Sequence, residues 1–107
     1  MKISSMLAIA ACISFPLAMN SQNNNKGETT FQEQCAGCHG PDGKAQTDTG
    51  KKIGAADLTS EDVQKMSDSE VMKVVKNGNK KMPAFGDKLS NDELKAVVAY
   101  IKELGKH

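Results

Sequence analysis

The stretch Cys35-Ala-Gly-Cys-His39 decides how the rest of the chain is interpreted, because it places two thiols three positions apart and an imidazole directly after the second. This Cys-x-x-Cys-His spacing is typical of covalent haem attachment. Two thiols so spaced at the end of a helix reach the two vinyl groups of one porphyrin, and the adjacent imidazole then lies beneath the iron. The small Ala36 and Gly37 let the porphyrin edge approach the backbone closely. We predict that Cys35 and Cys38 carry one haem and that His39 binds its iron.

Three other kinds of site use similar residues. A structural disulfide between Cys35 and Cys38 suits an exported protein but leaves His39 without a role. A thioredoxin-like redox pair requires a surrounding strand–helix pattern, which the sequence lacks. A zinc site requires four ligands, whereas this stretch offers three. His107, the other histidine, ends the chain, where we expect it to be solvated. Haem attachment is the interpretation that uses all three residues.

The sixth iron ligand must come from elsewhere, and methionine is the candidate. Met19 lies outside the expected folded portion, whereas Met66, Met72 and Met82 lie inside it. Met66 flanks a capping motif and Met72 adjoins a group of valines, so core packing explains both. Met82 precedes a proline in a loop where no helix face would bury it. A thioether is a soft ligand that favours ferrous iron and raises the potential of a His-ligated haem, so we predict Met82 as the second axial ligand.

The remaining segments carry helix signals, and no strand of convincing length occurs. The sequence Ser67-Asp-Ser-Glu70 fits a capping box, and Ser90-Asn-Asp-Glu93 repeats it. Apolar residues recur at helical spacing after the second box: Leu94, Val97, Val98, Ile101 and Leu104. We expect helices over 27–36, 59–66, 67–77 and 90–104, and mostly loop over 40–58. The fold class predicted from the residues is all-α.

The first residues resemble a secretory signal peptide. Lys2 precedes an apolar run that contains Pro16 and ends near Ala18, and an Asn-rich stretch follows. We therefore divide the chain into a signal peptide at 1–18, a flexible linker at 19–26 and a folded domain at 27–107. A retained membrane anchor is the alternative, although the run is short for spanning a bilayer. Cys12 follows a lipobox-like Ile9-Ala-Ala, so lipid anchoring there is a second alternative.

Composition limits the remaining possibilities. Removal of residues 1–18 takes away one of the 14 basic residues and none of the 13 acidic ones, so the mature formal charge is zero. Nothing therefore indicates a nucleic acid partner. A domain this small, with little aromatic content, has a thin core and usually depends on a disulfide, a metal or a bound group. A buried haem would supply the missing apolar volume.

Residues 27–107 resemble a small monohaem class I cytochrome c of the bacterial periplasmic or photosynthetic electron-carrier type. The resemblance rests on Cys35–Gly40, on Lys81-Met-Pro-Ala-Phe85 and on a closing helix that contains Tyr100. It implies three to five helices wrapped round one covalently attached haem c. It also implies that the first and last helices cross, with Gly27, Phe31 and Tyr100 at the crossing.

One stretch departs from the family pattern. Such proteins usually carry a proline after the haem motif, and its carbonyl accepts a hydrogen bond from the axial histidine. Here the stretch Ile53–Leu58 contains no proline. We expect a backbone carbonyl of Gly54 or Ala55 to replace it.

The resemblance implies a periplasmic one-electron carrier and not an enzyme. Its partners would be a donor and an acceptor protein that dock at the haem edge, and it would be a monomer without stable membrane insertion. A haem enzyme or sensor with an open sixth position, and a subunit fixed to one complex, are the alternatives. Loop lysines that cluster would steer an acidic partner; the candidates are Lys44, Lys51, Lys52, Lys80, Lys81 and Lys88.

Overall fold

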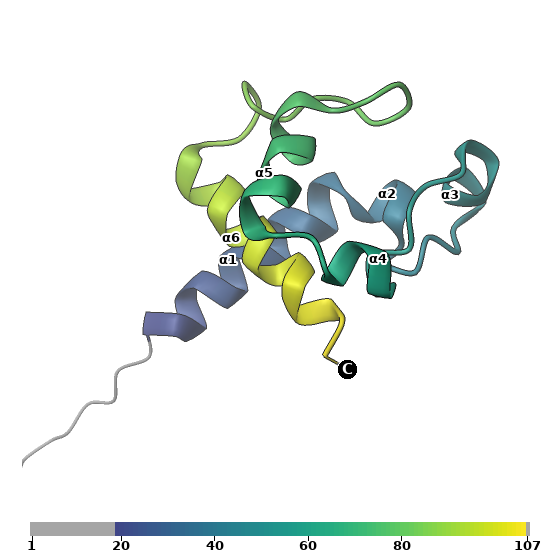
Figure 1. The fold of residues 1–107 in the computed structure, drawn as a ribbon. Helices are drawn as coiled ribbons and strands as arrows, with labels where there is room; N and C mark the ends of the chain where they lie inside the picture. The colour runs from purple at the N-terminus through teal and green to yellow at the C-terminus, as the bar shows by residue number, and fades with distance from the viewer. Residues whose placement is uncertain (1–18, 107) are drawn as a thin grey trace, which may run out of the picture.

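The protein is helical throughout the part that is described. A computed structural model describes residues 19–106, so the predicted signal peptide, Cys12 and His107 lie outside the described residues. Six helices and no strand occur within 19–106, which confirms the all-α prediction (Figure 1). The helices are α1 (Met19–Gln34), α2 (Ala36–His39), α3 (Asp48–Ile53), α4 (Glu61–Gln64), α5 (Asp68–Asn77) and α6 (Asn91–Leu104).

Two helices differ from the expectations. Helix α1 begins at Met19, so residues 19–26, which we expected to form a flexible linker, are helical. Helix α3 lies inside the segment 40–58 that we expected to be mostly loop. Thr47 starts this helix by accepting a hydrogen bond from the Gly50 amide, and Gly54 ends it in the left-handed conformation at φ 72°. A helix of six residues is too short to show apolar periodicity, which is why the sequence pattern did not reveal it.

The predicted boundaries of α5 and α6 are confirmed, whereas α4 is shorter at both ends than the helix that we expected over 59–66. Ser67 and Ser90 each accept a hydrogen bond from the amide three residues later, and both capping boxes are complete. Ser60 caps α4 in the same way, although without a box. Gly78 ends α5 with φ 70°, a conformation that glycine adopts without steric cost.

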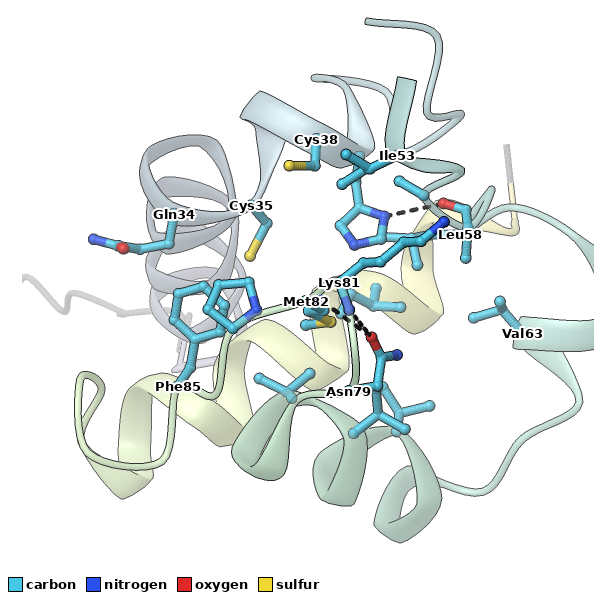
Figure 2. A pocket seen from close by; sticks show the side chains of 18 of the residues that line it. Gln34, Cys35, Cys38, Ile53, Leu58, Val63, Asn79, Lys81, Met82 and Phe85 are labelled. Atoms are coloured by element: carbon cyan, nitrogen blue, oxygen red, sulfur yellow. Dashed lines mark hydrogen bonds between the residues drawn. The ribbon is translucent and has the colours of Figure 1, made fainter. Parts of the chain in front are cut away.

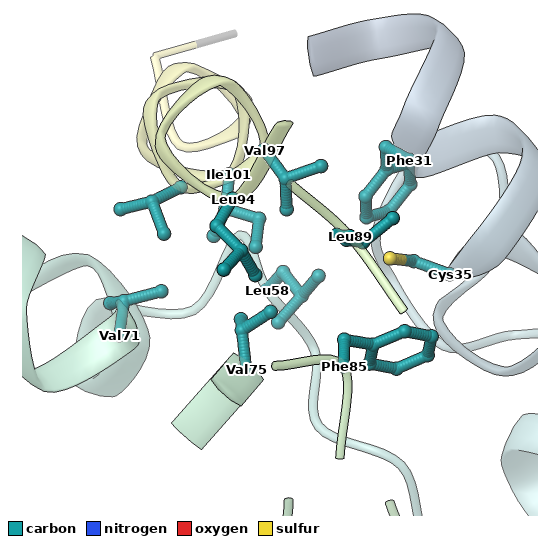
Figure 3. Close-up of a cluster of buried hydrophobic side chains, with 11 residues drawn as sticks. Phe31, Cys35, Leu58, Val71, Val75, Phe85, Leu89, Leu94, Val97 and Ile101 are labelled. Carbon is teal, nitrogen blue, oxygen red and sulfur yellow. The ribbon is translucent and has the colours of Figure 1, made fainter. Parts of the chain in front are cut away.

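The core is built where α1 crosses α6, and α5 packs against α6 beside that crossing (Figure 1). Phe31, Leu94 and Val97 are almost completely buried there (Figure 3). The Phe31 ring contacts the Tyr100 ring at a centroid distance of 5.2 Å and an interplanar angle of 53°. Cys35 belongs to the same buried cluster, so the crossing also fixes the start of the Cys-x-x-Cys-His stretch.

Helix α1 approaches α6 closely at Gly27. A Cβ at this position would lie 2.3 Å from the carbonyl oxygen of Ala96. The two helices are therefore in contact through their backbones, as the family resemblance implied for Gly27.

Among residues 19–106, no helix has the length and apolar character needed to cross a bilayer.

We expect Gly27→Ala to lower the free energy of unfolding by about 1–2 kcal/mol, because α1 and α6 must move apart to admit the methyl group. That loss exceeds the helix propensity that alanine gains over glycine, about 1 kcal/mol. Urea denaturation followed by circular dichroism measures the effect, with the exposed Thr29→Ala on the same helix as the control. An unchanged or raised midpoint for Gly27→Ala would show that the crossing is not close-packed.

Candidate functional site

One cavity is lined by the haem-motif residues and the methionine that the sequence singled out. Cys35, Cys38, His39 and Met82 all line it, and its volume is about 520 Å³ (Figure 2). The first three come from the α1–α2 junction and Met82 comes from the loop between α5 and α6. Most of the other lining side chains are apolar, and the volume lies in the range of cofactor sites.

Main-chain hydrogen bonds within the Cys-x-x-Cys-His stretch hold it in a turn. The chain turns at Cys35, whose carbonyl accepts hydrogen bonds from the amides of Cys38 at 3.2 Å and His39 at 2.9 Å. Cys35 is buried and Cys38 is half-buried, and both are free thiols. Burial, and then the neighbouring Cys38, raises the pKa of the Cys35 thiol from 9.0 to about 11. Both sulfurs are therefore held on one wall of the cavity, with Cys35 as a protonated thiol at neutral pH.

His39 is oriented by a main-chain hydrogen bond. Its Nδ1 lies 3.0 Å from the carbonyl oxygen of Ala56. Because a carbonyl only accepts, Nδ1 donates this bond, and in the neutral imidazole Nε2 then carries the lone pair that metal binding needs. We expected Gly54 or Ala55 to supply this carbonyl, which is wrong. Helix α3 reaches Ile53, and the Ala55 amide folds back to the Gly50 carbonyl at 2.9 Å, so Ala56 is the residue whose carbonyl meets the imidazole.

Thr47 connects α3 to the haem motif. Its hydroxyl donates toward the carbonyl oxygens of Gly37 at 2.9 Å and Cys38 at 3.3 Å, while its oxygen accepts from the Gly50 amide at 2.9 Å. Gly50 allows this contact, since a Cβ there would lie 2.1 Å from the Cys38 carbonyl oxygen. The free carbonyls of the short helix α2 are thus satisfied by a neighbouring helix start.

Met82 comes from a loop that is fixed to the last turn of α5. The Phe85 amide donates to the Val75 carbonyl at 2.9 Å, and the Gly86 amide to the Lys76 carbonyl at 3.1 Å. Met82 is half-buried and Phe85 is buried, so the loop returns to the core directly after Met82. Of the two methionines that we assigned to packing, Met72 contacts the core, whereas Met66 contacts the core and also lines the cavity.

The predicted lysines differ in their positions. Lys80 and Lys81 line the cavity, and Lys51 and Lys52 form the last turn of α3 directly before the lining residue Ile53. Lys88 lies over the Phe85 ring at 5.2 Å from its centroid, which gives it a packing contact as well as a charge. Lys44 is exposed on the loop before α3.

The residues present fit a covalently attached haem. A largely apolar cavity that opens to the surface, two free thiols that line it, an imidazole whose Nε2 is not used in the bond to Ala56 and a thioether in the same cavity are the features that such a group requires. Within residues 19–106, no group of three or more His, Cys, Asp or Glu side chains is arranged to hold a metal ion. Sequence reasoning missed Thr47 and Ala56. The Thr47-Asp-Thr-Gly50 start of α3 was a detectable capping signal, whereas nothing in the sequence marked Ala56.

The chain is similar to several known c-type cytochrome proteins. Residues 22–101 match the model of the family described as cytochrome c oxidase, cbb3-type, subunit III. A cytochrome c6-like protein of Nostoc sp. (strain PCC 7120) is 33% identical over 84 residues, which is 78% of this chain and 73% of that protein. The cbb3-type oxidase subunit CcoP of Azospirillum brasilense is 29% identical over 75% of this chain but only 28% of its own length. A solved c-type cytochrome, KustC0563, superposes with a TM-score of 0.67 at 31% identity and covers 73% of this chain and 95% of its own.

We expect Thr47→Val to lower the free energy of unfolding by about 1–2 kcal/mol, because the Gly37 carbonyl and the Gly50 amide both lose their partner. Thr47→Ser keeps the hydroxyl and should stay within about 0.5 kcal/mol of the parent protein. Urea denaturation of the three proteins measures both changes. A loss of stability in Thr47→Ser with none in Thr47→Val would mean that the threonine methyl group, and not the hydroxyl, holds α3 to the motif.

Proposed function

Because this chain belongs to the c-type cytochrome family, as a small monohaem class I cytochrome c, we propose that it is an exported one-electron carrier with His39 and Met82 as its axial iron ligands. Proteins of this family are electron-transfer proteins with covalently bound haem c, and the chain is one of them. The observation that carries the proposal is the hydrogen bond from His39 Nδ1 to Ala56, which leaves Nε2 free in the cavity that Met82 also lines.

In this proposal each residue of the motif has one task. Cys35 and Cys38 form the two thioether bonds, and His39 Nε2 binds the iron from the same wall of the cavity. The Ala56 carbonyl keeps the imidazole in one tautomer and one orientation and raises its basicity. When bound, the haem supplies the couple between ferric and ferrous iron.

Met82 would occupy the second axial position. Its thioether raises the reduction potential, and a filled sixth position excludes water and small ligands from the metal. The apolar side chains around it exclude water from the remainder of the cavity, which favours the less charged ferrous state. A site of this kind exchanges electrons without binding a substrate, so the chain needs no further reactive group.

The exported location rests on the N-terminal sequence. A basic Lys2, an apolar run and a polar segment after it have the order of a secretory signal peptide. We propose that residues 1–18 are removed and that a monomeric domain of residues 27–107 works in the periplasm, with α1 beginning upstream at Met19. Lipid attachment at Cys12 is the variant of this proposal that would hold the protein at the membrane surface.

The redox partners would dock where the cavity reaches the surface. Lys80 and Lys81 line the cavity and are exposed, and Lys51 and Lys52 are exposed at the adjacent end of α3. Positive charge at the haem edge attracts an acidic partner over several ångströms and lets it dissociate again at moderate salt. This suits a carrier that meets a donor and an acceptor in turn.

We expect Met82→Ala to abolish the far-red absorption band of methionine–iron bonding in the ferric protein and to lower the reduction potential, because the thioether is lost. Met66→Leu and Met72→Leu are the matched controls and should keep the band. Visible spectra and redox titration of protein made in cells with haem-maturation machinery measure both effects. Retention of the band in Met82→Ala, with its loss in Met66→Leu, would transfer the axial role to Met66.

We expect the double variant Lys51→Gln/Lys52→Gln to slow oxidation of the reduced protein by ferricyanide roughly threefold at low salt, because two positive charges near the cavity are lost. The cationic oxidant tris(phenanthroline)cobalt(III) should react faster with the same variant. Lys26→Gln/Lys95→Gln makes the same charge change at exposed positions that neither line the cavity nor adjoin a lining residue in the sequence. Stopped-flow rates that fall equally in both double variants would show that net charge, not a local basic surface, controls the reaction.

A further inference from the structure

We propose that Asn79 is a positioning residue, which holds the Met82 backbone so that the thioether is presented to the cavity. The proposal rests on the proposed axial role of Met82. Asn79 belongs to none of the sequence motifs described above. Its side chain makes its hydrogen bonds to Lys81 and Met82 and not to the haem motif.

The Asn79 side chain closes a turn around Met82. Its Oδ1 accepts hydrogen bonds from the amides of Lys81 at 3.1 Å and Met82 at 3.0 Å (Figure 2). The main-chain amide of Asn79 donates to the main-chain carbonyl of Met82 at 3.0 Å. Asn79 therefore contacts both the amide and the carbonyl of the proposed ligand, and its side chain replaces a backbone acceptor in the turn.

Among the described residues 19–106, the only other support for this part of the loop is the half-buried Met82 side chain, which packs against the core. Within residues 19–106, every hydrogen bond to the main chain of residues 80–84 comes from Asn79. Lys80, Lys81, Pro83 and Ala84 are exposed, so core packing does not hold these positions either. The bonds from Phe85 and Gly86 to α5 anchor the loop only after Met82.

The residue before Asn79 shows how closely the turn is packed. Gly78 has φ 70°, and a Cβ there would lie 2.5 Å from the Met82 carbonyl oxygen. The loop thus folds back over the end of α5 at a position where only glycine fits. This close contact fixes the main chain directly before Asn79. The hydrogen bonds of Asn79 then fix the main chain of Met82.

The thermodynamic consequence is a change in the population of an open loop. If the turn is lost, Met82 is free for a larger fraction of the time. An added ligand competes for the axial position only during that fraction, so its apparent affinity rises in proportion. The affinity for imidazole therefore measures how firmly Met82 is held, without any assay of electron transfer.

The experiment compares four variants with the parent protein in the ferric state. Asn79→Ala removes the acceptor, and Asn79→Asp keeps an acceptor oxygen in the same place. Asn77→Ala is the matched control, since this exposed asparagine ends α5 and its side chain has no hydrogen bond to any described residue. Met82→Ala gives the spectrum and the imidazole affinity of a protein with no thioether ligand.

We expect Asn79→Ala to bind imidazole about tenfold more tightly than the parent, the factor that corresponds to about 1.4 kcal/mol. Its far-red band should also disappear at a lower temperature. Asn79→Asp and Asn77→Ala should stay within about twofold of the parent. Equal affinities in Asn79→Ala and the parent, or equally raised affinities in Asn79→Ala and Asn79→Asp, would overturn the role of the acceptor oxygen.

The failure of this inference is distinguishable from that of the proposed function. If Met82→Ala keeps the far-red band, Met82 is not the ligand and the proposed ligation fails. If Met82→Ala loses the band and Asn79→Ala behaves as the parent, only the inference about Asn79 fails.

Amide exchange in the parent protein also tests the proposal, and it does not depend on whether any variant folds. The amide protons of Lys81 and Met82 should exchange with solvent at least about tenfold more slowly than that of Lys80, because only the first two donate to Asn79. Comparable exchange at all three positions would overturn the proposal directly.

Discussion

The hydrogen bond from His39 Nδ1 to the Ala56 carbonyl is the interaction on which the site depends. It fixes the tautomer of the imidazole and therefore decides which nitrogen can bind a metal. It also ties the segment after α3 to α2, so the wall of the cavity that carries His39 is formed from two parts of the chain. A short helix of four residues would not hold an imidazole in one orientation by itself. The surrounding structure supplies that constraint through Ala56, Thr47 and Gly50.

The need to hold the haem motif in one position also explains where the small core lies. The α1–α6 crossing buries Phe31 and Val97 completely, and Cys35 lies at its edge within the same cluster. One thiol is thus part of the protein core, while Cys38 and His39 extend from it into the cavity. Apolar packing therefore sets the position of the motif, and the cavity beside it leaves volume that a porphyrin would fill. A domain this thin gains stability from such a group as well as function.

Local signals in the sequence predicted much of this arrangement. The serine caps at Ser67 and Ser90 and the Cys-x-x-Cys-His turn depend on residues within a few positions of one another, so their pattern is visible in the chain itself. Helix α3 was missed because it has no apolar face that a short stretch of sequence would reveal. The acceptor for His39 was assigned to the wrong residue, since its identity depends on where α3 ends and how Gly54 turns the chain. The axial role of Met82 stays a prediction.

The two proposed iron ligands are supported in different ways, and this difference has consequences for the chemistry. His39 is held through its Nδ1 by the Ala56 carbonyl, and its neighbours Gly37 and Cys38 are held by Thr47 at the start of α3, so freeing it requires that these segments separate from α2. The Met82 side chain packs against the core, but its main chain is held by one local turn on a largely exposed loop, so its release breaks fewer contacts than release of His39 would. A thioether has little affinity of its own for ferric iron, so the rigidity of that turn contributes to keeping the sixth position filled. The mobility of residues 79–84 would then set both the potential of the carrier and its resistance to small ligands.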